Sequence, residues 1–137
     1  MKKLFFLLLL FVALLLVACQ SKSVTGEDIS VAGGSYKNVD PKGLNTMLKN
    51  KDFVFINVHT PFAGNIAGTD LSIAYDQIEQ NLSQLPTDKN AKIVLYCRSG
   101  HMSQIAAEKL VSLGYTNVWS LKGGMMEWEK AGFDLEK

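Results

Sequence analysis

One cysteine, Cys97, stands in the setting that a reactive thiol needs. It follows the apolar run 93–96, which reads as a buried strand, and it opens a six-residue turn with Gly100 near its middle; a helical pattern resumes at Ser103. A strand that passes a cysteine to a turn before a helix puts the sulfur at the carboxyl end of a sheet, where α/β folds place their sites. Backbone N–H groups of such a turn favour an anion. Cys97 is therefore predicted to be a nucleophile, and the alternative is a buried structural cysteine.

A wider set of residues around this turn resembles the second half of a rhodanese domain. The resemblance spans about 36–132 and is dense from Ile93 onward. The matching positions are Tyr96, Cys97, Arg98, Ser99, Gly100, Ser103, Ala106, Ala107, Leu110, Gly114, Tyr115, Asn117, Val118, Leu121, Gly123, Gly124 and Trp128. The resemblance implies one rhodanese-like domain over residues 36–137, of class α/β, with a mainly parallel sheet and helices on both faces.

The length of the turn separates two activities that share this fold. Rhodanese-like sulfurtransferases have a six-residue loop counted from the cysteine, whereas related phosphatases and arsenate reductases use Cys-x5-Arg with an arginine that holds the oxyanion. Six residues after Cys97 comes Ser103, not arginine. Sulfur transfer is therefore favoured over phosphate chemistry.

The resemblance implies a two-step reaction through a Cys97 persulfide. The thiolate attacks the outer sulfur of thiosulfate or of an organic persulfide, and a thiol-type acceptor, such as a thioredoxin-like partner, then removes that sulfur. The expected substrate-binding loop comprises Arg98, Ser99, Gly100, His101, Met102 and Ser103. Its main-chain N–H groups would hold the anionic sulfur, and the Ser103 hydroxyl would add a donor while also capping the next helix. Arg98 either steers anionic donors or is bound structurally to the loop, and Met102 favours an organic persulfide over thiosulfate.

The chain departs from the family before the second half of the sheet. Rhodanese-like domains usually carry Asp and Arg two apart at the end of an earlier strand, whereas this chain has Asn57 and His59. His59 has two interpretations. It acts in the pocket as a neutral hydrogen-bond donor or a pH-sensitive cation, or it is a polar residue at the end of a strand with no role in the site. Asp70, after the loop that follows, is a second candidate for the pocket. The altered pair leaves open a non-catalytic binding, scaffold or persulfide-sensing module, although such modules usually lack the cysteine.

The remaining elements are predicted from apolar spacing and turn residues. Asp40 and Pro41 predict a helix start. Strands are expected over 36–39, 53–58, 69–74 and 117–121, and a helix over 75–85. A helix after the Cys97 turn should bury Ile105, Ala106, Leu110, Val111 and Leu113, and a final helix should bury Met125 and Trp128.

The pattern of charged and apolar residues at the amino terminus predicts an export signal. Two lysines precede an unbroken apolar run from Leu4 to Val17, too short to span a membrane comfortably. The run ends in Leu-Val-Ala-Cys at 16–19, which resembles a bacterial lipobox. We expect a lipoprotein signal peptide over 1–18, a lipid on Cys19 and a flexible tether over 19–35. The protein would then be a membrane-anchored, extracytoplasmic lipoprotein, and Cys97 would be left as the one thiol of the mature chain.

Composition excludes several other functions. The chain of 137 residues carries 14 basic and 13 acidic side chains, so nothing favours nucleic acid as a partner. The folded domain offers one cysteine and two histidines, whereas a structural zinc site needs four ligands. We therefore expect neither a metal nor a cofactor.

Overall fold

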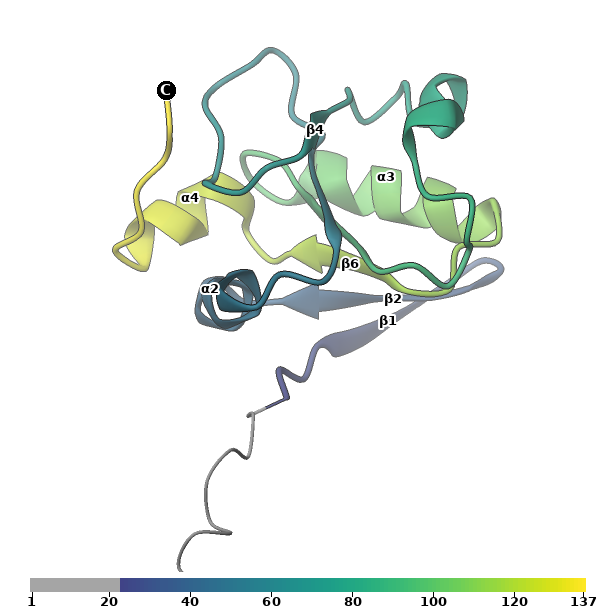
Figure 1. The fold of residues 1–137 in the computed structure, drawn as a ribbon, viewed down its shortest axis with the longest axis horizontal. Helices are drawn as coiled ribbons and strands as arrows, with labels where there is room; N and C mark the ends of the chain where they lie inside the picture. The colour runs from purple at the N-terminus through teal and green to yellow at the C-terminus, as the bar shows by residue number, and fades with distance from the viewer. Residues whose placement is uncertain (1–22) are drawn as a thin grey trace, which may run out of the picture.

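A six-stranded sheet with helices on both faces forms the centre of the computed structural model, which describes residues 23–137 (Figure 1). In chain order the elements are β1 (Glu27–Val31), β2 (Gly34–Val39), α2 (Pro41–Lys49), β3 (Val54–Asn57), β4 (Leu71–Ser72), the 3₁₀ helix η1 (Glu79–Gln84), β5 (Ile93–Tyr96), α3 (His101–Ser112), β6 (Val118–Leu121) and α4 (Gly124–Lys130). The strand order is β1-β2-β6-β5-β3-β4. The β1–β2 pair is antiparallel and the other pairs are parallel, which confirms the predicted α/β class.

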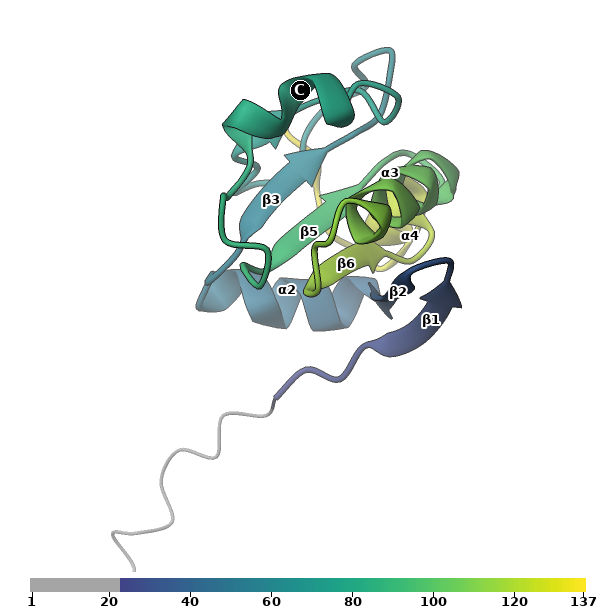
Figure 2. The same ribbon diagram turned by 90° about the vertical axis from the view of Figure 1, so that its right-hand side faces the viewer.

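Alternation along β5 divides the core into two layers. Ile93 and Leu95 pack with α3, whereas Val94 and Tyr96 pack on the opposite face, where α2 and α4 lie (Figure 2). All four side chains of β5 are buried, as expected for a central parallel strand covered on both faces. Since successive strand residues point to opposite faces, Cys97 continues the series of Ile93 and Leu95 toward α3.

Local sequence signals explain where several elements begin. The Asp40 carboxylate accepts a hydrogen bond from the Gly43 N–H (2.6 Å), and Pro41 occupies the first turn of α2. The final helix buries Met125 and Trp128, as predicted.

The first two strands correct the predicted tether over 19–35. Residues 27–35 belong to the domain, because β1 pairs with β2 from Glu27–Asn38 to Val31–Gly34. Gly33, with φ of 89°, provides the reversal between the two strands. β1 contributes only Ile29 and Val31 to the core, so its apolar signal is too weak to mark a strand in the sequence.

Two helix predictions also need correction. The segment 75–85 buries Ile78 and Leu85, as its spacing predicts, yet it forms η1 rather than an α-helix. Asn81, with φ of −113° and ψ of 20°, departs from helical geometry, and its side chain donates to the Gln77 carbonyl oxygen (2.8 Å) instead. Ile105 was expected in the core, but it is 38% exposed on the outer side of α3.

The described part of the chain begins on the α2 face of the sheet. Ser23 and Val24 line a cleft together with residues at the end of α2, near the beginning of β3 and β5, and on β6: Thr46, Met47, Asn50, Asp52, Lys92 and Trp119. Val24 packs against the core layer that contains Leu44 of α2, whereas Cys97 belongs to the layer beneath α3. The first described residues and the sulfur of Cys97 therefore lie on opposite faces of the sheet.

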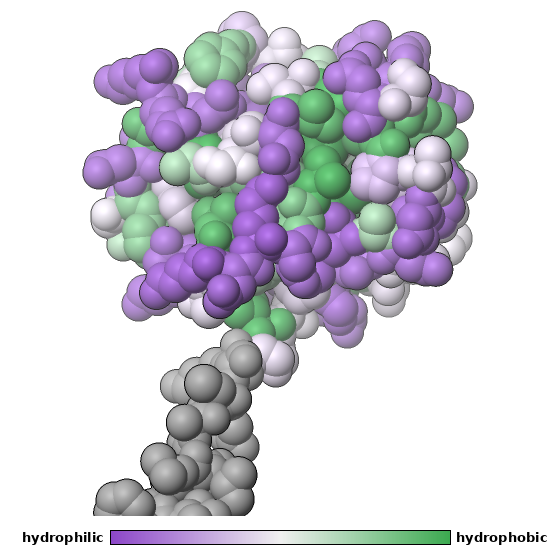
Figure 3. Space-filling view, viewed as in Figure 1, coloured by the Kyte–Doolittle hydropathy of each residue, from purple (hydrophilic) through white to green (hydrophobic). Residues whose placement is uncertain are grey.

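The expected signal peptide 1–18 and the lipidation site Cys19 lie outside the described residues. Within 23–137, no helix is both long and apolar enough to cross a membrane. Hydrophilic and hydrophobic residues alternate in small groups over the face shown in Figure 3.

Candidate active site

Cys97 lies at the point where β5 passes into the turn before α3. Its residue is 1% exposed and contributes to the core layer beneath α3. The chain reverses at Gly100, whose φ of 96° is a conformation that favours glycine, and α3 starts at His101, two residues earlier than the sequence pattern predicted. The turn is therefore shorter, and the sulfur closer to the helix start, than expected.

The backbone of this turn directs a donor at the sulfur. The Gly100 N–H donates to Cys97 Sγ with a distance of 3.0 Å between nitrogen and sulfur. Sγ also lies 3.7 Å from the Ser103 hydroxyl oxygen, to which the neutral thiol donates. A hydrogen bond to a charged acceptor is stronger than one to a neutral acceptor, so this amide donor suits an anionic sulfur.

Two serines connect the sulfur to the neighbouring strand. The Ser103 hydroxyl donates to the Gly100 carbonyl oxygen (3.1 Å) and accepts from the Ser120 hydroxyl on β6 (2.9 Å). Both serines are at most 2% exposed. The predicted capping role of Ser103 is wrong, because Gly100 is the N-cap and makes no side-chain capping bond. Ser103 sits inside the helix start and faces the sulfur instead.

The turn rests on the beginning of α4. The carbonyl oxygen of Cys97 accepts from the Met125 N–H (2.8 Å), and that of Arg98 accepts from the Met126 N–H (3.0 Å). Because a trans peptide holds its N–H opposite its C=O, the N–H groups of Arg98 and Ser99 point away from α4. Contact with α4 thus fixes the orientation of two peptide planes next to the sulfur.

The rest of the predicted binding loop is accessible. Arg98, Ser99 and His101 are exposed, whereas Gly100 and Met102 are half-buried, with Met102 packed against the same core layer as Cys97. One side of the loop borders a cleft of about 320 Å³. The cleft is lined by Ser99, Gly100 and His101 from the loop and by Tyr36, Asn38, Gln104, Ser120, Leu121, Lys122 and Gly123.

His59 lies beside this loop at the end of β3. The strand pairing matches Asn57 with Tyr96, and the Val58 N–H donates to the Tyr96 carbonyl oxygen (2.8 Å), which brings His59 level with the first residues after β5. Burial lowers the pKa of His59 below its ordinary value, and the positive charge of Arg98 lowers it further. His59 is therefore a neutral neighbour of the loop rather than a second cation.

Asn57 replaces the acid of the family pattern with a structural amide. Its side chain is buried, its nitrogen donates to the Gly64 carbonyl oxygen (3.0 Å) and to Asn65 Oδ1 (2.9 Å), and its oxygen accepts from the His59 N–H (3.0 Å). These bonds close the segment that follows β3. Asn57 therefore holds His59 in place without adding charge.

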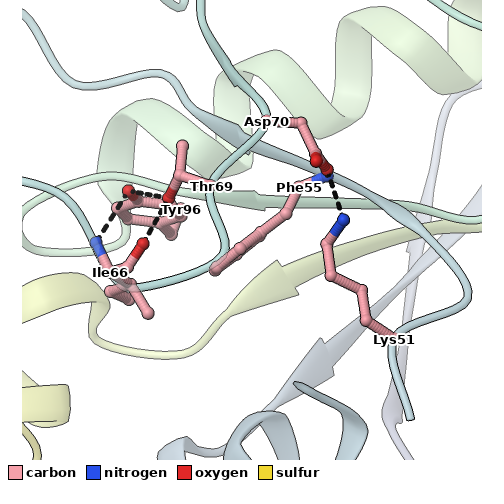
Figure 4. A network of polar contacts seen from close by, with 6 residues as sticks. All are labelled: Lys51, Phe55, Ile66, Thr69, Asp70 and Tyr96. Carbon is pink, nitrogen blue, oxygen red and sulfur yellow. Dashed lines mark hydrogen bonds and ion pairs between the residues drawn. The ribbon is translucent and has the colours of Figure 1, made fainter. Parts of the chain in front are cut away.

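Asp70 is held in a different network, away from the loop (Figure 4). Its carboxylate accepts from Lys51 Nζ (2.6 Å) and from the Phe55 N–H in the middle of β3 (2.8 Å). Burial opposes ionisation of Asp70, but the hydrogen bonds from Lys51 and Phe55 prevail and lower its pKa. Asp70 thus has two structural partners and makes no hydrogen bond with the residues of the Cys97 turn, so its predicted place in the pocket is wrong.

Tyr96 anchors the second network of Figure 4. Its hydroxyl accepts from the Ile66 N–H (3.0 Å) and contacts Thr69 Oγ1 (2.7 Å). Burial raises the pKa of Tyr96, so the phenol stays protonated. Tyr96, directly before Cys97, therefore fixes the segment 65–69 on the opposite face of the sheet.

Chemically, the site presents a shielded sulfur, an amide donor, two hydroxyls and one nearby cation. That combination suits a nucleophilic thiolate and an anionic sulfur bound to it. In the described part of the chain, no group of three or more His, Cys, Asp or Glu side chains is arranged to hold a metal ion. Ser120 was missed in the sequence, where it reads as one more residue of a buried strand.

Comparison with known proteins places these observations in a family. The family model of the rhodanese-like domain matches residues 43–131. A sulfurtransferase from Allochromatium vinosum is 29% identical over 100 residues, which cover 71% of this chain and 92% of that protein. An adenylyltransferase and sulfurtransferase from Candida albicans is 35% identical over 100 residues, covering 66% of this chain but only 23% of the longer protein.

The fold agrees with the sequence comparisons. A rhodanese-related protein from Thermoplasma volcanium superposes with a TM-score of 0.62 at 25% identity, covering 73% of this chain and 97% of the other. With a matching family model over most of the folded part and the cysteine turn in place, this chain belongs to the family of rhodanese-like domains.

Proposed function

We propose that the protein is a sulfurtransferase that carries sulfane sulfur on Cys97. The observation that carries the proposal is the 3.0 Å contact from the Gly100 N–H to Sγ, at the head of a turn whose peptide planes α4 orients. A bound persulfide needs such preorganised donors, because its terminal sulfur is anionic. Ser103 at the sixth position after Cys97 leaves the loop without the arginine that phosphate chemistry requires.

The reaction balances without an external oxidant. The Cys97 thiolate attacks the outer sulfur of thiosulfate, an S–S bond forms at Sγ, and the bond to the sulfonate breaks with release of sulfite. With an organic persulfide as donor, the leaving group is the organic thiolate. An acceptor thiolate then attacks the terminal sulfur of the Cys97 persulfide, takes it away as a new persulfide and returns Sγ as a thiolate.

Mass spectrometry tests the intermediate directly. After treatment with thiosulfate or with cysteine persulfide, we expect a peptide containing Cys97 to gain one sulfur atom and to lose it when a small thiol is added. The Cys97→Ser variant is the control and should gain none. If no donor loads the wild-type protein, sulfur transfer is wrong and a binding module is favoured.

Phosphatase assays address the related activity. We expect negligible turnover of an aryl phosphate. The arginine that binds the phosphoryl group in related phosphatases is the sixth residue after the cysteine, whereas Arg98 is the first residue after Cys97. Turnover that disappears in Cys97→Ser would contradict the assignment.

We propose further that a lipid on Cys19 attaches the protein to the extracytoplasmic face of a membrane. Support comes from the charged start, the apolar run and the Leu-Val-Ala-Cys sequence at 16–19. We expect Cys19→Ser to abolish lipid labelling and to remove the mature protein from the membrane fraction, while Cys97→Ser stays anchored. Unchanged labelling and fractionation of Cys19→Ser would contradict the lipid anchor.

A further inference from the structure

The ring of His59 has one nitrogen that the fold seals off. Nδ1 is buried and has no hydrogen-bond partner among residues 23–137, although the residue as a whole is only half-buried. Nε2 makes no hydrogen bond within residues 23–137 and is not among the buried unpartnered atoms, so it is the nitrogen that solvent or a ligand can reach. An orphaned atom of this kind requires an explanation, since buried polar atoms are almost always paired.

The burial of Nδ1 affects which protonation state of the His59 ring is favoured. A charged imidazole carries a proton on both nitrogens, and neutral imidazole carries one. A proton on Nδ1 would be a buried donor without an acceptor, and an unprotonated Nδ1 is a buried acceptor without a donor. The charged ring adds a positive charge near Arg98 to the first of these costs, so the fold disfavours it most. Of the two neutral forms, the one with its proton on Nε2 keeps its N–H within reach of solvent.

The neighbouring groups favour the same form. The positive charge of Arg98 acts on the ring, and its effect on the pKa of His59 has the same sign as that of burial. The main chain of His59 is fixed by the Asn57 side chain (3.0 Å) and by the pairing of the preceding residues with β5, so its backbone has a defined position level with the first residues after β5.

We propose that His59 is a specificity-determining residue that offers the sulfur donor an uncharged Nε2–H beside Arg98. The inference rests on the proposed sulfur transfer and names its preferred substrate class. With a neutral His59, Arg98 is, among residues 23–137, the single cation where β3 and β5 end. One positive charge suits the single negative charge of an organic persulfide better than the two negative charges of thiosulfate. Nε2–H donates to the leaving sulfur of the organic donor without adding a positive field.

Nitrogen NMR of the imidazole tests the protonation state without any sulfur donor. The chain has two histidines, so His101→Gln leaves His59 as the single ring to be observed. We expect the ring of His59 to become charged at a lower pH than free histidine in the same buffer, and the neutral ring to carry its proton on Nε2. Protonation at or above the pH at which free histidine is protonated, or a neutral ring with its proton on Nδ1, would overturn the proposal whether or not Cys97 forms a persulfide.

Donor preference tests the consequence. His59→Arg should raise kcat/KM for thiosulfate relative to cysteine persulfide by about tenfold. His59→Gln, which keeps an uncharged N–H, should leave that ratio within about twofold of the wild type. An unchanged ratio in His59→Arg, in a protein that still loads sulfur on Cys97, would refute the specificity role and leave the proposed function standing.

Discussion

At the scale of single residues, Ser103 and Ser120 add side-chain hydroxyls to the hydrogen bonding of the Cys97 sulfur, which the backbone of the turn alone would not provide. When Sγ is a thiol it donates to Ser103; when it is a thiolate, Ser103 must turn its single proton toward the sulfur. The Gly100 carbonyl oxygen then loses the Ser103 donor but keeps the Gln104 N–H (3.1 Å). The Ser120 hydroxyl continues to donate to Ser103 and polarises it.

This arrangement predicts a graded loss of thiolate reactivity. A hydrogen bond of about 1 kcal/mol corresponds to about fivefold in rate, so Ser103→Ala should slow alkylation of Cys97 by iodoacetamide about fivefold at neutral pH. Ser120→Ala, which acts through Ser103, should slow it about twofold.

Ser112→Ala is the matched control. Its hydroxyl donates to the Lys109 carbonyl oxygen (2.6 Å) at the far end of α3, so alkylation of Cys97 should be unchanged. Equal rates for wild type and Ser103→Ala would show that the hydroxyl does not support the thiolate.

Residue types alone identified part of this site. Cys97 was recognisable because strand, turn and helix signals follow one another within a few positions. Ser103 was expected near the sulfur, but not its position inside the helix, because apolar spacing cannot fix a helix start to within two residues. Ser120 carries no local signal; only the pairing of β5 with β6, Leu95 opposite Ser120, brings it to the sulfur.

At the scale of elements, the contact between the Cys97 turn and α4 depends on a glycine. Gly124 has φ of 61°, and a Cβ built on it would lie 2.4 Å from the Cys97 carbonyl oxygen and 2.7 Å from the Arg98 carbonyl. Backbone atoms at that distance cannot move aside as a flexible side chain can. The approach of α4 to the turn therefore requires glycine at this position.

Gly124→Ala should both destabilise the fold and disturb the site. The left-handed backbone costs about 1–3 kcal/mol for alanine, and the clash adds about 1–3 kcal/mol. Denaturant unfolding should show the combined loss, and sulfur loading of Cys97 should fall in the molecules that remain folded, because the peptide planes of the turn are displaced.

Gly114→Ala separates the two costs. Gly114 has φ of 90° and nothing within 4 Å of a built Cβ, so this variant pays the conformational cost alone and should load sulfur normally. If the two variants lose the same stability and the same activity, close packing of α4 on the turn has no role.

Most elements were predictable where apolar spacing is strong, as in α2, β3, β5 and β6. The 75–85 segment shows the limit of that signal: its buried residues were correctly expected, but polar side chains such as Asn81 compete for backbone hydrogen bonds and change the helix type. β1 was not predicted, because a short, mostly exposed edge strand is stabilised by its partner rather than by its own sequence.

At the scale of the whole molecule, the first strand pair tests where the folded unit begins. A chain that starts at Tyr36, the predicted boundary, lacks β1 and the first residues of β2, and uncovers core residues that Ile29 and Val31 contact. We expect it to lose about 2 kcal/mol, or roughly 10 °C in Tm, relative to a chain that starts at Ser23.

The comparison is made by calorimetry on the two shortened chains. A chain that starts at Val24 keeps the strand pair and the side chain of Val24, which packs against the core, and serves as the control with a Tm close to that of the Ser23 chain. Equal Tm values for the Tyr36 and Ser23 chains would mean that β1 contributes nothing to stability.

The two faces of the sheet also determine from which direction the protein can be used. Val24 packs in the core layer on the α2 face, and Cys97 belongs to the layer on the α3 face. A body attached through the amino-terminal side would meet the α2 face and leave the α3 face pointing outward. Donors and acceptors would then arrive from the open face, and neighbouring copies on one surface would not obstruct each other's sulfur.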